Sequence, residues 1–130
     1  MVEVLIATGI LITAAVAIPH LFTAATRANV EAGAITWATT LAAQKLEELE
    51  ARPSLDTIGL ESIDYLDWRG ALDTPGSPPR AFTRRWWIEP LPWAPDGALV
   101  LGVAVSRYRE GDDANPDVVR LVTLRTRTVP

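Results

Sequence analysis

The chain has 130 residues and a formal charge of −4, from 12 basic and 16 acidic side chains. This length fits one small domain, and the acidic balance disfavours a nucleic-acid binder that reads phosphates with a basic surface. Because the chain has no cysteine and one histidine, a disulfide framework, a thiolate metal site, a cysteine nucleophile and a multi-histidine metal cluster are all excluded.

The first element is an apolar run from Val4 to Phe22 that contains no charged residue. As a helix it would rise about 28 Å, close to the roughly 30 Å hydrocarbon core of a bilayer. We therefore expect residues 1–22 to form a membrane-spanning or filament-core helix. Two alternatives are a secretory signal peptide and the core helix of a soluble protein. The first would need a basic segment and a small-residue cleavage site, and the second is rare in a chain this small.

The helical pattern continues from Thr23 to Arg52, with Gly33 as its only glycine and no proline. This part is amphipathic, because its apolar residues share one face. Those residues are Ala34, Trp37, Ala38, Leu41, Ala42, Leu46 and Leu49, opposite Asn29, Thr36, Thr40 and Glu47. Pro53 is expected to end the helix. A bend is expected at Pro19 or Gly33. Residues 23–52 should therefore pack on the rest of the chain.

After the helix, residues 53–80 are rich in proline and glycine, which predicts an irregular connector with one short helical turn around Glu61–Leu66. Three strands are then predicted from alternating or β-branched residues. They span Ala81–Ile88, Ala98–Tyr108 and Val118–Thr126, joined by hairpin loops at Pro92–Gly97 and Glu110–Asp117.

These elements predict an α+β fold, in which a long N-terminal helix packs on a small antiparallel sheet. Residues 53–130 would supply the connector and the sheet head. One face of such a sheet needs a partner, and the amphipathic helix half of residues 23–52 supplies it.

Two segments of the helix carry a resemblance to a known family. Residues 2–7 read VEVLIA, with an apolar residue ahead of a glutamate and an apolar run, and residues 41–49 read LAAQKLEEL. The first resembles the start of the mature helix in the type IV pilin and type II secretion pseudopilin superfamily. The second is similar to the end of that helix in minor pilins of the PilV type and minor pseudopilins of the GspI type.

This resemblance implies a structural role as a minor pilin of a type IV pilus, with a minor pseudopilin of a type II secretion system as the alternative. It implies a single pass in the inner membrane, a periplasmic sheet domain, and incorporation into a pilus or pseudopilus. The implied partners are other subunits, packed through the N-terminal helix, together with a prepilin peptidase and an assembly platform. The family's leader and processing glycine are absent from the sequence as given, which predicts a late start codon or a trimmed chain.

Glu3 is the candidate assembly residue. The resemblance implies that it pairs with the N-terminal amine of a neighbouring subunit. A carboxylate costs about 2.5–3.5 kcal/mol at the centre of a bilayer and less near the interface, so an opposite charge on a partner would remove that cost. The alternative is an ordinary acidic residue in a first helical turn, favoured by the helix dipole.

Small residues and the proline of the apolar run are the candidate helix-packing positions: Ala7, Gly9, Ala14 and Pro19. Small side chains let two helices approach closely in lipid. The alternative is that alanine is simply common in membrane helices.

Three tryptophans lie close together in the sequence and form a candidate partner surface: Trp86, Trp87 and Trp93. Because adjacent strand residues face opposite ways, the alternative places one of Trp86 and Trp87 in the core beneath the helix, in contact with Trp37. The other would then face outward.

No residue pattern predicts catalysis. Residues 111–117 hold three carboxylates and an amide, which would suit calcium but equally suit a solvated turn. No nucleophile, phosphate-binding or metal-spacing motif accompanies His20, so we expect no enzyme, no metal and no cofactor.

Besides the minor pilin and the minor pseudopilin, a third possible function comes from a different class. It is a single-pass membrane protein whose small extracytoplasmic domain binds a ligand or partner.

Overall fold

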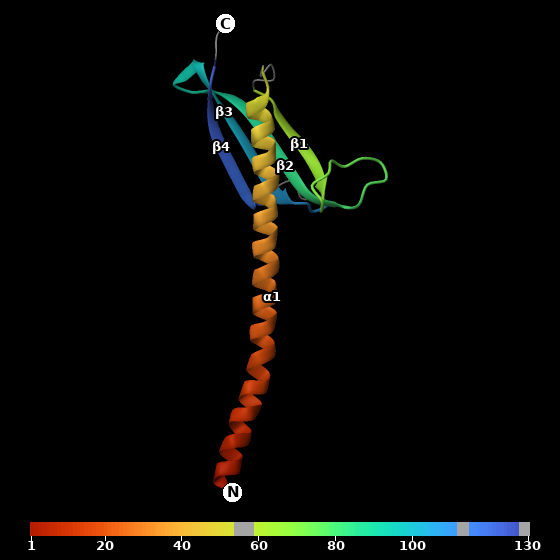
Figure 1. The fold of residues 1–130 in the computed structure, drawn as a ribbon, viewed down its shortest axis with the longest axis vertical. Helices are drawn as coiled ribbons and strands as arrows, with labels where there is room; N and C mark the ends of the chain where they lie inside the picture. The colour runs from red at the N-terminus through yellow and green to blue at the C-terminus, as the bar shows by residue number, and fades with distance from the viewer. Residues whose placement is uncertain (54–58, 112–114, 128–130) are drawn as a thin grey trace. The chain divides into compact units, whose positions relative to one another are not determined.

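The structure is a computed structural model and describes residues 1–53, 59–111 and 115–127. Its described elements are one long helix and four strands (Figure 1). They are α1 (Val2–Ala51), β1 (Glu61–Asp67), β2 (Arg80–Leu91), β3 (Ala94–Arg107) and β4 (Val119–Thr126). The predicted α+β fold is confirmed.

The chain divides into two compact units, Met1–Ala34 and Ile35–Pro130, so the boundary lies within α1. The first unit is helical throughout, and every residue from Met1 to Gly33 is exposed. The helix remains continuous through both Pro19 and Gly33. Any bend at these two positions, as expected from the sequence, therefore occurs without a break in the helix.

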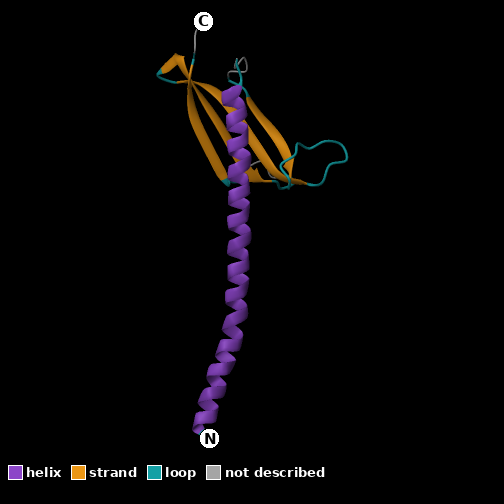
Figure 2. Cartoon of the chain, viewed as in Figure 1, coloured by secondary structure: helices purple, strands orange, loops and turns teal. Residues whose placement is uncertain are grey.

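The second unit is an antiparallel meander in the order β1-β2-β3-β4 (Figure 1), and its strands are drawn in orange in Figure 2. One row of paired residues crosses all four strands: Glu61 opposes Trp87, Trp87 opposes Gly102, and Gly102 opposes Val122. Because side chains alternate along a strand, this row lies on one face of the sheet. The neighbouring row, which includes Trp86 and Val103, lies on the other face, beneath the helix.

The helical turn predicted at 61–66 is wrong, because these residues form β1. The segment reads ESIDYLD and alternates, with Leu66 fully buried on one face and Ile63 half exposed on the other. Its residues 61–66 pair in register with β2, and the register shifts between Leu66 and Asp67. Pairing with a longer strand therefore overrides the weak local preference of this segment.

The hairpin loop predicted at Pro92–Gly97 is also wrong. Ala94 already pairs with Leu91, so that only Pro92 and Trp93 form the turn between β2 and β3. Both strands are longer than predicted, because they continue through residues that are usually found in turns. The bounds of β4 differ from the prediction by one residue.

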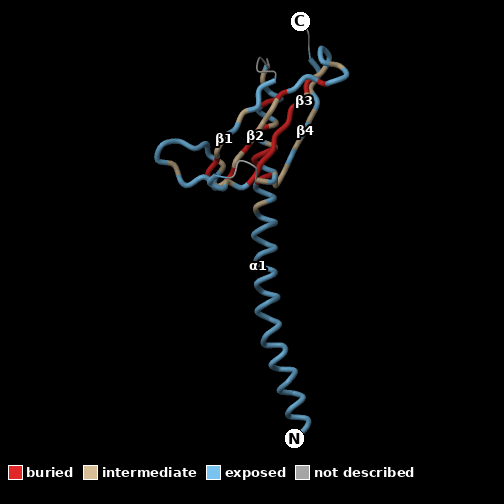
Figure 3. The backbone as a smooth tube through the Cα atoms, turned by 180° about the vertical axis from the view of Figure 1, so that it is seen from behind, coloured by how far each residue is buried: buried red, intermediate tan, exposed pale blue. Residues whose placement is uncertain are grey.

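The hydrophobic core lies between the sheet and the last turns of α1 (Figure 3). The helix contributes Ala38, Leu41, Ala42 and Leu49, and the strands contribute Leu66, Phe82, Ile88, Leu99, Leu101, Val103 and Val105. Full burial of one such leucine or isoleucine contributes about 1.5–3 kcal/mol. The predicted amphipathic face is thus confirmed for its central residues.

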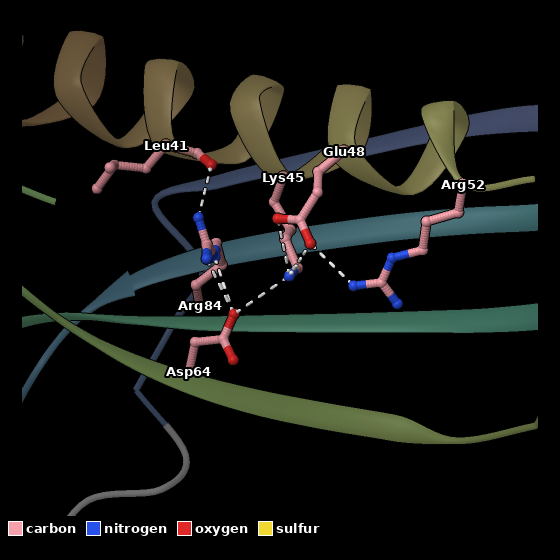
Figure 4. Close-up of polar contacts among 6 residues, drawn as sticks. All are labelled: Leu41, Lys45, Glu48, Arg52, Asp64 and Arg84. Atoms are coloured by element: carbon pink, nitrogen blue, oxygen red, sulfur yellow. Dashed lines mark hydrogen bonds and ion pairs between the residues drawn. The ribbon is translucent and has the colours of Figure 1, made fainter. Parts of the chain in front are cut away.

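An ionic cluster fastens the same helix turns to β1 and β2 (Figure 4). Arg84 of β2 donates from Nη2 to Asp64 of β1 at 2.9 Å, and its Nη1 donates to the backbone carbonyl of Leu41 at 3.4 Å. Lys45 is only 7% exposed and lies 3.1 Å from Glu48 and 3.9 Å from Asp64. Because a buried charge is costly without a partner, this arrangement specifies which part of the helix lies over the sheet.

Glu48 completes the cluster on the exposed side. Its carboxylate accepts a hydrogen bond from Arg52 at 2.8 Å. This bond, assisted by Lys45 and opposed by partial burial, holds the pKa of Glu48 below its ordinary value. At the other edge of the sheet, Arg125 of β4 donates to the carbonyl of Leu49 at 3.3 Å. Arginine side chains therefore bind carbonyls of the helix from β2, at Leu41, and from β4, at Leu49.

Candidate functional site

The apolar part of α1 is long and apolar enough to cross a membrane, and none of that window is buried in the chain. Its large apolar side chains are all at least 58% exposed: Val2, Val4, Leu5, Ile6, Ile10, Leu11, Ile12, Val16, Ile18, Leu21 and Phe22. Runs of consecutive residues among these place apolar side chains on every side of the helix. A surface of this kind requires lipid or other protein around it.

The threonines of the first unit do not present free hydroxyl hydrogens. Thr8 donates to the carbonyl of Val4 at 2.6 Å, and Thr13 donates to that of Gly9 at 2.8 Å. Thr23 donates to the carbonyl of Pro19 at 2.8 Å. Each hydroxyl is therefore satisfied within the helix, which keeps the polar groups of this segment compatible with a medium that offers no hydrogen bonds.

Glu3 lies in the first turn of α1, where its side chain is exposed. The next charged residue along the chain is Arg27. The helix dipole favours an acid at this end, as in the alternative interpretation of the residue. The position also leaves one carboxylate at the start of an otherwise uncharged segment, available to a cation of another molecule.

A shallow groove runs along the apolar helix. It is lined by Ile6, Gly9, Ile10, Thr13, Ala14 and Ala17. Two of the predicted packing residues, Gly9 and Ala14, thus lie together, whereas Ala7 and Pro19 do not line this groove. A Cβ atom added to Gly9 would meet nothing within 4 Å, so the missing side chain serves no packing within this chain. It leaves room for a helix from elsewhere.

The tryptophan pair of β2 divides between the two faces of the sheet. Trp86 packs against the core, with Lys45 at 5.0 Å and Arg52 at 5.6 Å from its ring centroid. These cations flank the ring, and the indole Nε1 of Trp86 is buried without a partner in the described part of the chain. Trp37 lies beside Gly70, two turns earlier on the helix than Lys45. Trp86 thus contacts two cations as well as the core, and the described residues show no ring pair between Trp86 and Trp37.

Trp87 faces the opposite side, and its ring lies directly over Gly102 of β3. A Cβ atom at Gly102 would come within 2.2 Å of the ring, so only glycine permits this approach. Arg120 of β4 lies 4.9 Å from the ring centroid on the exposed side. Trp87 is therefore half-buried, and it presents less free surface than Trp93, which is 80% exposed at the β2–β3 turn.

A groove of about 420 Å³ lies beside Trp87. It is lined by Gly59, Leu60, Glu61, Arg85, Trp87, Glu89 and Arg120. Its arginines are already paired, since Arg85 lies 2.7 Å and Arg120 lies 3.5 Å from Asp117. Mutual neutralisation leaves little net charge to select a ligand, so this groove has the chemistry of a solvated ionic surface.

Metal binding finds no support in the described residues. Within 1–53, 59–111 and 115–127, no group of three or more metal-ligating side chains occurs. Part of the loop considered for calcium, residues 112–114, lies outside the described residues. Of its remaining members, Asp117 is engaged by arginines and Asn115 donates to the carbonyl of Arg107.

Sequence reasoning missed the ionic cluster and the stacking of Arg120 on Trp87. Arg84 and Asp64 are 20 residues apart, and Arg84 and Leu41 are 43 apart, so no local spacing connects them. A lysine at position 45, on the buried face of an amphipathic helix, was the available signal, because such a charge requires a partner.

Comparisons of the chain with protein-family models, with curated proteins and with solved structures found no match in any of the three. The function must therefore be inferred from the residues and the geometry described above.

Proposed function

We propose that this protein is a structural subunit of a type IV pilus, a minor pilin, held in the inner membrane by residues 1–22 before assembly. The observation that carries the proposal is the apolar first half of α1, none of which is buried in the chain. The resemblance of residues 2–7 and 41–49 to the pilin superfamily supports the same assignment. In this role the helix exchanges lipid for the helices of neighbouring subunits.

The chemistry of the helix supports assembly by packing rather than by ligand binding. Its threonine hydroxyls are bonded to its own backbone, and its groove at Gly9 and Ala14 has room for another helix. Close packing of small residues is a main source of helix association in apolar surroundings. Glu3 would also fix the axial alignment of neighbouring subunits, since a lone carboxylate in apolar surroundings favours a position beside a cation.

The sheet unit has a different role in this proposal. Its core and ionic cluster hold residues 38–52 of the helix. Anchored in this way, the sheet would be carried on the periplasmic side and then on the surface of the fibre. A minor pseudopilin of a type II secretion system would use the same arrangement, and copurification with one fibre or the other would separate the two.

The test is a pair of substitutions on the same helix, Glu3→Gln and Glu31→Gln, expressed in the source cell. Both variants should remain in the membrane fraction. Glu3→Gln should lower recovery in sheared fibres by about tenfold, equivalent to losing roughly 1.4 kcal/mol of a single charge pairing, whereas Glu31→Gln should be recovered like the wild type. The two positions are both exposed on α1, so Glu31→Gln controls for removing a carboxylate.

Two of the following results would contradict the proposal, and one would remove only the role of Glu3. Recovery of the wild type as a soluble monomer would exclude a membrane role for the helix. Equal recovery of both variants in fibres would make Glu3 incidental. A wild type that stays in the membrane and never enters a fibre would favour a single-pass protein with an extracytoplasmic binding domain.

A further inference from the structure

β4 is an edge strand of the sheet. In the strand order β1-β2-β3-β4, β4 pairs only with β3. The N–H of Arg127 donates to the carbonyl of Gly97 at 2.9 Å, in line with the pairing of Ala98 and Thr126. Since hydrogen-bonding direction alternates along an antiparallel strand, the N–H and C=O groups of even-numbered β4 residues point away from β3. These residues are Arg120, Val122, Leu124 and Thr126.

The opposite edge, at β1, is covered by the chain itself at its C-terminal end, from Tyr65 to Asp67. The N–H of Asp73 donates to the carbonyl of Tyr65 at 2.8 Å, and the N–H of Asp67 donates to that of Ala71 at 2.9 Å. Leu66 also forms a bridge with Leu72. No comparable contact reaches the outward groups of β4 within the described residues. Natural proteins protect exposed edges in this way, so β4 differs from the covered end of β1 in the same sheet.

The side chains along this edge combine apolar surface with positive charge. Val122 is 56% and Leu124 is 60% exposed, and both lie on the face away from the helix. Arg120, Arg125 and Arg127 lie in or next to the strand. Arg120 is paired with Asp117 at 3.5 Å, whereas Arg125 and Arg127 donate to backbone carbonyls, which do not neutralise their charges, so the strand keeps a local positive charge. This contrasts with the formal charge of −4 of the whole chain. The edge therefore selects for an apolar and acidic neighbour.

We propose that β4 accepts an extended acidic segment of a partner protein as a fifth, antiparallel strand of the sheet. Backbone bonds to the outward groups at Val122 and Leu124 would supply general affinity, as in other cases of strand addition. Alternate side chains of the segment would cover these two apolar residues. Acidic side chains would lie near the arginines, which gives the segment its selectivity.

A second copy of this chain fits the edge less well. Two β4 strands placed edge to edge would bring together Arg125 and Arg127 of both copies, whose guanidinium groups are bonded to backbone carbonyls and not to acids. Like charges that face each other across a strand pair are destabilising. The proposal uses only residues of the sheet unit, so it stands or falls independently of the role of the apolar helix.

The binding test uses the full chain in lipid nanodiscs and two labelled peptides of about eight residues. One peptide alternates valine with glutamate, and the other alternates valine with lysine. Fluorescence anisotropy should show the glutamate peptide binding at least about tenfold more tightly than the lysine peptide. The difference should shrink as salt is raised from low ionic strength, because exposed charges are screened.

Two variants test whether the peptide binds at the β4 edge. Leu124→Pro removes an outward N–H and leaves the bonds to β3 in place, and it should weaken the glutamate peptide by at least about tenfold. Leu124→Glu keeps every backbone group, and should weaken the glutamate peptide while strengthening the lysine peptide. Unchanged near-ultraviolet circular dichroism serves as the folding control for both, and the second variant answers the question if proline perturbs the fold.

Several outcomes would overturn the proposal. They are absence of binding, equal binding of the two peptides, and wild-type affinity in Leu124→Glu. A further one is a wild-type dimer that excludes the peptide and dissociates on Leu124→Glu substitution. That last result would assign the edge to a second copy of the chain instead of an acidic partner.

Discussion

The two units of this chain, residues 1–34 and 35–130, contain the same long helix but differ in what surrounds it. In the first unit every residue through Gly33 is exposed, although the segment is the most apolar part of the sequence. In the second unit, Leu41 and Leu49 of the same helix are fully buried and even Lys45 is covered. Helix formation and burial are therefore separate properties here. The apolar half depends for its burial on other molecules, and the amphipathic half on its own sheet.

The sharpest way to break this comparison is to truncate one leucine in each unit. Leu41 is 1% exposed and Leu11 is 70% exposed. Leu41→Ala should lower the free energy of unfolding of the sheet unit by about 2–5 kcal/mol, because it removes buried contacts and leaves a cavity. Leu11→Ala should change it by less than about 0.5 kcal/mol. Denaturant titration in detergent, monitored by the near-ultraviolet circular dichroism of the tryptophans, measures the free energy of unfolding of both variants.

Equal losses for the two leucines would mean that the first unit is packed against something within the monomer. A loss below about 1 kcal/mol for Leu41→Ala would mean that the helix contributes little to the core, contrary to the burial of that side chain.

A smaller effect is expected from adding one methyl group to a glycine in each unit. At Gly102 a Cβ would come within 2.2 Å of the Trp87 ring, whereas at Gly9 it would meet nothing within 4 Å. Gly102→Ala should destabilise the sheet unit by about 1–3 kcal/mol through overpacking. Gly9→Ala should leave that unit unchanged and favour the helix by up to about 1 kcal/mol.

Thermal unfolding of the two glycine variants provides the measurement. If the Trp87 ring moved aside freely, Gly102→Ala would unfold like the wild type, and the close approach of ring and backbone would have no energetic weight. Gly9→Ala also tests the proposed fibre role. Reduced incorporation of this variant into fibres would indicate that a neighbouring helix packs against Gly9.

The smallest expected effect is a pH dependence that arises only in the second unit. The hydrogen bond from Arg52, with help from Lys45, lowers the pKa of Glu48 below its ordinary value of 4.5. Because the pKa is lower in the folded state, the ionised Glu48 carboxylate contributes its full stabilisation at pH values above its ordinary pKa. This stabilisation is lost as the pH falls from the ordinary pKa through the lower pKa of the folded state. The loss should be under about 1 kcal/mol, because the Glu48 carboxylate is about half exposed to solvent.

Denaturant titrations at a series of acidic pH values would detect this loss, and Glu48→Gln should flatten the curve in that range. A Glu48→Gln curve that matches the wild type would show that other carboxylates dominate acid destabilisation.

The sequence predicts the helix and three of the strands well, because their hydrophobic periods are strong. The end of α1 was predictable because residues 23–52 contain no proline and Pro53 follows them directly. The buried face from Ala38 to Leu49 follows the 3.6-residue repeat of a helix. β1 was missed because it is short and half polar. Its strand conformation becomes evident only once β2 pairs with it, residue against residue from Glu61 to Leu66.

The candidate site was predictable only in part, for the same physical reason. The exposed apolar helix, the position of Glu3 and the opposite directions of Trp86 and Trp87 all follow from local rules. The stacking of Arg120 on Trp87 and the partial cover of the β1 edge depend on which segments become neighbours. The open edge at β4 was likewise invisible, because a strand looks the same in sequence whether or not something covers it.

The threonines of the apolar helix have one more consequence. With their hydroxyls bonded one turn back along the backbone, they present mainly methyl groups to the outside. A helix surface of methyl groups makes nearly equivalent contacts with lipid acyl chains and with the methyl groups of another helix. Transfer of the apolar part of α1 from lipid to a helix bundle would then involve only a small enthalpy change, and shape complementarity between the helices would decide which environment is favoured.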